Sequence, residues 1–157
     1  LLHENRLRRS PRLNKSNITV TTTPVDKLEL DSYPGDLGQV ITNLMENAMV
    51  HGYAGLSSGV IEIDISTPRT GWVSIRVRDF GHGIPKASLD KVFDPFFTTR
   101  LGQGGSGLGL SIVYTMVTRT LGGSIRVQSE LGQGSCFTVD IPLHAPEQEP
   151  AAPAALP

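Results

Sequence analysis

Hydrophobic residues alternate with polar residues in four separate segments of this chain. The apolar positions are Ile61, Ile63 and Ile65; Val73, Ile75 and Val77; Ile125 and Val127; and Phe137, Val139 and Ile141. A period of two predicts strands with one buried face and one wet face, whereas a doubly wound parallel sheet would show continuous apolar runs. We therefore predict an α/β (α+β) fold, a two-layer sandwich with a mixed, mostly antiparallel sheet and helices on one face.

Two further segments repeat at the spacing of a helix. The first follows Tyr33-Pro34-Gly35, where a proline suits the first helical turn. Its predicted buried stripe is Leu37, Val40, Ile41, Leu44, Met45 and Ala48, and its polar side is Gln39, Asn43, Glu46, Asn47 and His51. A second helix is predicted over residues 108–121, with Leu110, Val113, Val117 and Leu121 on its apolar side and Gly122-Gly123 at its end.

Shorter patterns complete the chain. Ile18 to Thr22 and Leu28 to Leu30 are predicted as short strands. Residues 1–16 contain an arginine cluster without interleaved aromatic residues, which favours a solvated linker or helix end over a nucleic-acid patch. Residues 17–143 are predicted to form the domain, and residues 144–157 a disordered tail rich in Ala and Pro.

Size and charge narrow the possible functions. The chain has 157 residues and a formal net charge of -1, so its charge gives no reason to expect nucleic acid or an anionic membrane as a partner. Its single cysteine, Cys136, cannot form an internal disulfide and is compatible with a reducing, cytoplasmic location. No apolar run approaches the ~20 residues of a membrane helix. Because the chain begins at Leu1 without Met, we expect it to be part of a longer protein.

Asn43 and Asn47 are four residues apart and share one face of the first predicted helix. Mg²⁺ takes oxygen ligands and keeps several waters, with phosphates supplying the rest of its shell. An asparagine carbonyl aimed at a bound triphosphate would fit that preference. The alternative is the ordinary polar face of a surface helix, and the glycine-rich segments downstream favour the magnesium interpretation.

Asp79 ends a predicted strand and precedes Gly81 and Gly83. A carboxylate held there can accept a hydrogen bond from the exocyclic amine of adenine, and the glycines allow backbone and ligand to approach closely. The alternative is a plain turn after a strand. Gly102 to Gly109 contains five glycines in eight residues and runs into the second helix, which is typical of backbone N–H groups that wrap a phosphate.

A third segment, Phe93 to Arg100, lies between these two glycine segments. Its aromatic residues are candidates for the hinge and anchor of a lid, and Arg100 for a contact with the terminal phosphate; a pinned surface loop is the alternative. His51 is expected either to touch phosphate or magnesium-bound water, or to cap the helix end. His82 is expected to point to solvent.

Taken in order, these segments resemble the catalytic and ATP-binding domain of sensor histidine kinases, in the superfamily that also holds gyrase B, heat-shock chaperone and mismatch-repair ATPases. Asn43 to Ala48 resembles the family's asparagine box, Asp79 to Ile84 its first glycine box and Phe93 to Arg100 its phenylalanine box. Gly105 to Val113 resembles the second glycine box, and Gly132 to Phe137 its closing Gly-x-Gly-Thr-x-Phe. The resemblance implies a Bergerat-type ATP-binding fold.

The resemblance also implies roles at the matching positions. Asn47 would bind Mg²⁺, Asn43 would face the phosphates, and Asp79 would hold the adenine amine with help from Ser135. Asn43, Asn47 and Arg100 are the implied catalytic residues. The implied ATP-binding residues are Asn47, His51, Asp79, Gly81, Gly83, Ile84, Phe96, Thr98, Thr99, Gly105, Gly107, Leu108, Gly109, Leu110 and Ser135. Residues 98–107 would form a mobile lid.

Two departures from the family pattern bear on function. Ser135 stands where the family usually has Thr, which keeps the hydroxyl. A phosphoacceptor histidine is missing, because His3-Glu4 lacks the following Pro and lies too close to Asn43. The resemblance thus implies that ATP phosphorylates a histidine on the protein's own dimerisation and phosphoacceptor domain, outside this chain, and that a response regulator is the next partner.

Two alternatives stay open at this point. The first is an anti-sigma-type serine kinase of the same superfamily, which the run from Asn47 to Tyr53 partly resembles. The second is a degenerate nucleotide-binding scaffold, which the intact Asn47 and Asp79 disfavour. Within the histidine kinase interpretation this part of the protein is cytoplasmic and has no membrane contact, whether or not the whole protein is membrane-anchored.

Overall fold

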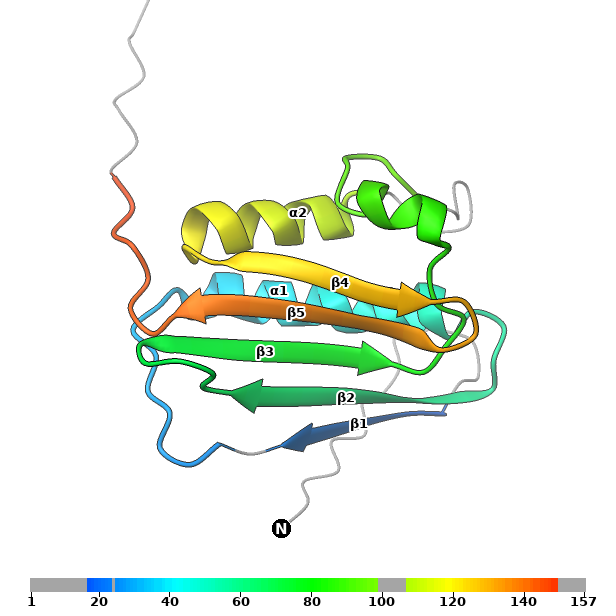
Figure 1. Ribbon diagram of the computed structural model, residues 1–157, viewed down its shortest axis with the longest axis horizontal. Helices are drawn as coiled ribbons and strands as arrows, with labels where there is room; N and C mark the ends of the chain where they lie inside the picture. Colours follow the sequence, from blue (N-terminus) through cyan, green and yellow to red (C-terminus); the bar gives the residue numbers. More distant parts are fainter. Residues whose placement is uncertain (1–16, 24, 99–106, 150–157) are drawn as a thin grey trace, which may run out of the picture.

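The computed structural model describes residues 17–23, 25–98 and 107–149, which form a sheet with helices on one face (Figure 1). The strands are β1 (Asn17–Thr23), β2 (Ser58–Ser66), β3 (Trp72–Asp79), β4 (Ser124–Glu130) and β5 (Gly134–Pro142). They pair in the order β1-β2-β3-β5-β4, with β1 and β2 parallel and the other pairs antiparallel. The predicted mixed, mostly antiparallel sheet is confirmed.

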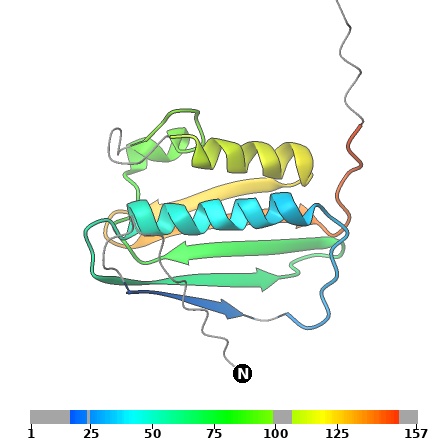
Figure 2. The same cartoon turned by 180° about the vertical axis from the view of Figure 1, so that it is seen from behind.

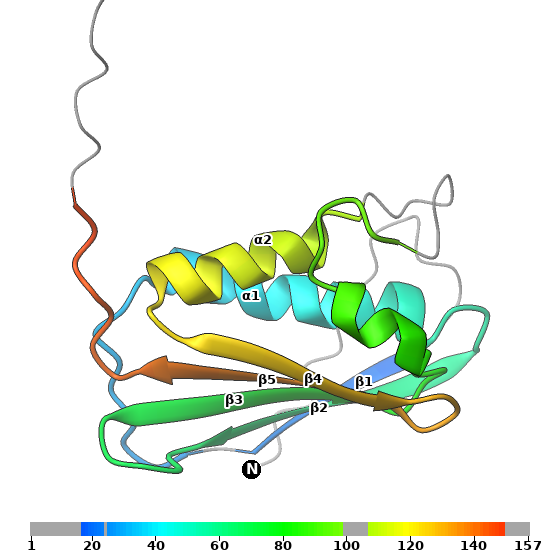
Figure 3. The same cartoon turned by 45° about the horizontal axis from the view of Figure 1, so that its top comes forward.

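The helical layer contains α1 (Pro34–Asn47) and α2 (Gly109–Thr115), which lie side by side on the same face of the sheet (Figures 2 and 3). Each helix ends in a π-helical turn, η1 (Ala48–Gly52) after α1 and η3 (Met116–Thr120) after α2. A 3₁₀ turn, η2 (Lys86–Lys91), follows the loop after β3. No helix within the described ranges is long and apolar enough to cross a membrane.

The core lies between the two layers, where the patterns of the sequence predict it. Val40, Leu44 and Ala48 of the first stripe are buried, as are Val113, Val117 and Leu121 of the second. These side chains pack against the inward residues of the central strands, which include Ile61, Ile63, Val73, Ile75, Val77, Phe137, Val139 and Ile141. Inward residues alternate with outward ones along these strands, which confirms the period-two interpretation, although the outward Ser74 and Thr138 of β3 and β5 are also buried.

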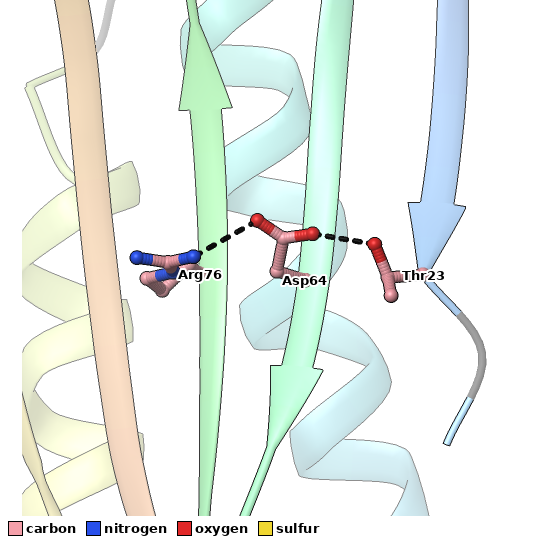
Figure 4. Close-up of polar contacts among 3 residues, drawn as sticks. All are labelled: Thr23, Asp64 and Arg76. Carbon is pink, nitrogen blue, oxygen red and sulfur yellow. Dashed lines mark hydrogen bonds and ion pairs between the residues drawn. The ribbon is translucent and has the colours of Figure 1, made fainter. Parts of the chain in front are cut away.

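Within the described ranges no helix covers the outward face of the sheet, and this face carries polar side chains that pair across strands. Thr23, Asp64 and Arg76 lie in one row across β1, β2 and β3 (Figure 4). The Thr23 hydroxyl donates to the Asp64 carboxylate at 2.6 Å, and Arg76 donates to its other oxygen at 3.1 Å. Arg126 likewise pairs with Asp140 across β4 and β5. These pairs satisfy the charged groups on this outward face.

Two predictions about elements need correction. Leu28 to Leu30 is not a strand, because these residues run as a loop whose leucine side chains pack on the edge of the core, and the neighbouring Asp31 forms an isolated bridge with His144. The second helix does not begin at Leu108; it begins at Gly109, with Leu108 preceding its first turn.

Residues 144–148, here called the C-terminal strap, return across the end of the sandwich where α1 begins. Ala145 N–H donates to the Asp31 carbonyl at 2.8 Å, and the Tyr33 hydroxyl donates to the Pro146 carbonyl at 2.9 Å. The Gln148 side chain donates to the Arg119 and Thr120 carbonyls at the end of η3. The predicted disordered tail therefore does not include residues 144–148. Residues 1–16, predicted as a linker or helix end, lie outside the described ranges.

Candidate functional site: a cavity at the end of α1

A cavity of about 590 Å³ opens at the end of the sandwich where α1 passes into η1. Its walls come from that helix end, the turn after β3, the loop around η2 and the start of α2. The lining residues are Asn43, Glu46, Asn47, Val50, His51, Ala54, His82, Gly83, Ile84, Pro85, Ser88, Val92, Phe97, Thr98, Gly107, Gly109, Leu110 and Leu131. Its volume is that of a small-molecule site, and its lining is mainly apolar with a few polar groups, several of them on α1.

The polar wall belongs to α1. Asn43, Glu46 and Asn47 face the cavity together because residues three and four apart share one side of a helix. The Gln39 side-chain amide donates to the Asn43 Oδ1 at 2.8 Å, so the Asn43 oxygen already has a partner and its NH₂ group is left to donate. Within the described ranges Asn47 has no side-chain hydrogen bond, and its amide oxygen can accept a ligand.

Asp79 is the buried carboxylate of the site, with 3% of its surface exposed at the end of β3. Its Oδ1 accepts the Gly81 N–H at 3.0 Å. Burial raises the pKa of the Asp79 carboxyl, and the backbone N–H groups of Gly81 and Ser135 and the charge of His82 lower it in part. Asp79 packs closely against Gly52 rather than lining the cavity: a Cβ at Gly52 would lie 2.8 Å from Asp79 Oδ1.

The turn after β3 is held between two backbones. His82 N–H donates to the Gly52 carbonyl, and Gly132 N–H donates to the His82 carbonyl, both at 2.8 Å. A Cβ at Gly81 would lie 1.9 Å from the Gly52 carbonyl oxygen. Gly83 has a φ of 74°, and a Cβ there would lie 2.1 Å from the Glu130 carbonyl oxygen. Only glycine fits such close contacts, which explains the spacing of the two glycines.

Tyr53 and Ser129 support this turn, and neither was predicted as a site residue. The buried Tyr53 hydroxyl accepts the Phe80 N–H at 2.8 Å and the Val60 N–H at 3.1 Å, and donates to the Val60 carbonyl. Ser129 Oγ accepts the Ile84 N–H at 2.8 Å and donates to the Gly134 carbonyl at 2.7 Å. No local pattern distinguishes these residues, because their partners are distant in sequence.

The Ser135 hydroxyl lies 2.9 Å from Ser129 Oγ, while Ser135 sits opposite Asp79 in the register of β3 and β5. Ser135 is buried and does not line the cavity. Its side chain therefore contributes to the support behind Asp79, together with Ser129.

Two side chains differ from the sequence prediction. Phe96 does not line the cavity: its φ is 64°, its side chain is 70% exposed, and its neighbour Phe97 lines the cavity instead. The positive φ turns the chain at this position, which a sequence pattern does not reveal. His82 is exposed, as predicted, but it lines the cavity and its Nε2 lies 2.6 Å from the Ala54 carbonyl oxygen, so Nε2 donates a hydrogen bond.

The predicted site residues as a whole divide into three groups. The structure brings Asn43, Asn47, His51, Gly83, Ile84, Thr98, Gly107, Gly109 and Leu110 to the cavity wall. Asp79, Gly81, Phe96, Leu108 and Ser135 are not part of that wall. Thr99, Arg100 and Gly105 lie outside the described residues. The wall also contains Glu46, Val50, Ala54, His82, Pro85, Ser88, Val92, Phe97 and Leu131, which the sequence analysis did not select.

The donor set at this wall suits a hard cation that arrives with its own ligands. The described residues contain no cluster of three or more His, Cys, Asp or Glu side chains that could hold a metal ion by themselves. The wall does offer the Asn47 amide oxygen beside the Glu46 carboxylate. Mg²⁺ is typically held by one or two protein oxygens plus phosphates and water, and these residues fit that pattern.

Residues 33–145 match the family model described as histidine kinase-, DNA gyrase B-, and HSP90-like ATPase. The chain belongs to this family. It is 37% identical over 128 residues to the two-component sensor PprA of Pseudomonas aeruginosa, covering 80% of this chain and 14% of PprA. It is 38% identical over 138 residues to the sensor histidine kinase ZraS of Escherichia coli, covering 87% of this chain and 28% of ZraS. The chain thus spans less than a third of either relative.

Solved structures of histidine kinases have the same fold. The catalytic domain of the histidine kinase ThkA superposes with a TM-score of 0.68 at 30% identity, over 83% of this chain and 80% of that chain. The mycobacterial sensor histidine kinase MprB gives 0.66 at 26% identity, over 85% and 86%. Full-length ShkA, solved in complex with AMPPNP, gives 0.65 at 27% identity, over 88% and 28%. The chain is an ATP-binding catalytic domain of the sensor histidine kinase type.

Proposed function

We propose that this domain binds ATP with Mg²⁺ in the cavity at the end of α1 and transfers the γ-phosphate to a histidine on another domain of the same protein. A response regulator would then take the phosphate. The observation that carries the proposal is the shared cavity, in which the polar face of α1 stands opposite the glycine turn after β3. Such a cavity offers oxygen ligands and donors on one side and close backbone approach on the other.

Each end of the nucleotide would meet a different part of the site. Asp79, fixed by the Gly81 N–H, would accept the exocyclic amine of adenine. The Asn43 side chain, whose oxygen accepts a hydrogen bond from Gln39, would donate through its NH₂ group to a phosphate oxygen. Asn47 would supply an oxygen ligand to Mg²⁺, which when bound neutralises phosphate charge. The protein's main task is then to position the γ-phosphate for the incoming imidazole.

Residues 98–107 would act as a lid over the phosphates, with Arg100 near the terminal one; Thr99, Arg100 and Gly105 belong to this part of the proposal. The proposed partners are the protein's own phosphoacceptor domain and a response regulator in the cytoplasm. Nucleic acid and membrane are not expected partners of this domain, since its net charge is -1.

Calorimetric titration with ADP, ATP and GTP tests the nucleotide site. We expect saturable, adenine-selective binding to the wild-type chain. Asp79→Asn should weaken ADP by about 1–3 kcal/mol, because a charge-assisted hydrogen bond is lost. Asp26→Asn is the matched control, since Asp26 is exposed and outside the cavity wall. Equal ADP affinity of the wild-type and Asp79→Asn chains would exclude the adenine role of Asp79.

Transfer requires the whole protein. We expect full-length protein incubated with γ-labelled ATP to carry acid-labile phosphate on a histidine outside residues 17–143. Acid-stable phosphate on serine of a separate protein would instead support the serine kinase alternative.

A further inference from the structure

Glu46 lies on the cavity wall beside Asn47, the residue proposed to supply an oxygen to Mg²⁺. It stands three residues after Asn43 and one before Asn47, so all three side chains face the same space from one side of α1. Its side chain is exposed, and within the described ranges it forms no ion pair or hydrogen bond. Its charge is therefore available to whatever enters the cavity beside Asn47.

The charge balance of this wall is unusual for a site that takes a polyanion. Among the described residues that line the cavity, Glu46 is the one carboxylate, and none is Lys or Arg. His51 and His82 are the other ionisable side chains there. A metal-free triphosphate beside Glu46 would meet a like charge, and two like charges a few ångströms apart repel appreciably even near a protein surface.

A divalent cation reverses the sign of this interaction. Mg²⁺ cancels phosphate charge and keeps several water ligands, which donate hydrogen bonds to nearby carboxylates. With Asn47 supplying an oxygen, the adjacent Glu46 on the same wall would be able to accept hydrogen bonds from such waters. The same side chain thus disfavours free triphosphate and favours the metal-bound form.

We propose that Glu46 makes nucleotide binding dependent on a divalent cation, by repelling metal-free nucleotide and stabilising the hydrated cation that accompanies the bound one. This inference rests on the proposed function of the cavity and adds a determinant of which nucleotide form is accepted. Glu46 differs in role from Asn47, since its effect on metal-free nucleotide is repulsive.

A charge series at this position tests the inference. The wild-type, Glu46→Gln and Glu46→Lys chains are titrated with ATP by calorimetry, once with excess Mg²⁺ and once with EDTA, at equal ionic strength. Glu46→Gln should bind metal-free ATP about threefold to tenfold more tightly, because a like charge is removed. It should bind Mg·ATP about twofold to tenfold more weakly, because a group that orders the cation's waters is lost. Glu46→Lys should bind metal-free ATP more tightly still.

The opposite direction of the two changes separates this role from general damage to the site. Glu29→Gln is the control, because Glu29 is exposed in the loop before α1 and does not line the cavity, so both affinities should match wild type. Thermal melts confirm that each variant is folded. If Glu46→Gln shifts both affinities in the same direction, or shifts neither, the inference is wrong while the nucleotide site stands. If folded wild type binds ATP in neither buffer, the proposed function itself fails.

Discussion

Two tyrosines hold opposite ends of α1, and they do so in different ways. Tyr53, beyond the end at the cavity, is 4% exposed and its hydroxyl joins the backbone of β2 to that of Phe80. Tyr33, just before Pro34, uses its hydroxyl to hold the C-terminal strap from outside through Pro146 and Gln148. The cavity end is thus supported by buried contacts within the domain, and the far end by exposed contacts to a segment laid across it.

The close contacts of the backbone also differ between the two ends of α1. At the cavity end, glycines 52, 81 and 83 let main chains and the Asp79 carboxylate approach more closely than any side chain would permit. At the strap end, most of the hydrogen bonds to the strap involve side chains, and Gly122 is the glycine that packs against the strap at Pro146. A site built from close backbone contacts tolerates little substitution, whereas a strap held by side chains should tolerate more.

Gly81→Ala should have the largest effect, because its Cβ would lie 1.9 Å from a backbone oxygen that cannot rotate away. We expect a loss of about 3 kcal/mol or more in the free energy of unfolding, from forced backbone movement. Gly38→Ala in α1 is the control: nothing lies within 4 Å of its Cβ, and it should stabilise the helix by about 0.5–1 kcal/mol. Urea denaturation measures both variants. Equal stabilities would show that the turn relaxes easily.

Tyr53→Phe compared with Tyr33→Phe tests the two ends directly. The first leaves the part-buried N–H groups of Phe80 and Val60 without their acceptor, a buried tyrosine hydroxyl, and should cost about 1–3 kcal/mol. The second removes exposed hydrogen bonds and should cost about 0.5–1 kcal/mol or less. The midpoints of urea unfolding of the two variants, measured where their m-values are equal, give the comparison. A larger loss at Tyr33 would reverse our view of which end determines stability.

The smallest expected effect is a pH dependence from Asp79. Burial raises its pKa in the folded protein, so its contribution to stability is greatest below its ordinary pKa and is lost as the pH rises through the raised value. Wild type should therefore lose stability relative to Asp79→Asn as the pH rises above about 4, the ordinary pKa of an aspartate side chain. Urea titrations of both chains from that pH upward give the difference. A constant difference, or one that changes in favour of wild type, would contradict the assigned shift.

Much of the fold follows from patterns that the chain shows locally. Alternation identified the strands that carry Ile63, Ile75 and Val139, since each of these strands has one buried face. Leu28 to Leu30 also alternates, but three residues suffice to bury two leucines on a loop, so the pattern was ambiguous there. The π-helical turns η1 and η3 were not predicted, because buried residues four apart, such as Val113, Val117 and Leu121, are equally typical of an ordinary α-helix.

The site could be predicted where its residues carry their own signal. Glycine pairs and asparagines one helical turn apart have recognisable spacings, and Asn43, Asn47 and Gly83 do reach one cavity. Tyr53 and Ser129 could not be predicted, since their importance comes from acceptors and donors that lie far along the chain. Phe97 lines the cavity in place of the predicted Phe96 because the φ angle of Phe96 is positive, and residue types alone do not specify that angle.

The order of the strands has a consequence for how the site moves. β3 is the middle strand, hydrogen-bonded on one side to β2 and on the other to β5, and Asp79 is its last residue. In native-state hydrogen exchange, a central strand opens only when the whole domain unfolds, while helix ends and loops open far more often. The strand that carries the Asp79 carboxylate therefore belongs to the most protected part of the domain, and under the proposed function any movement around bound nucleotide would fall to the helix ends and loops that line the cavity.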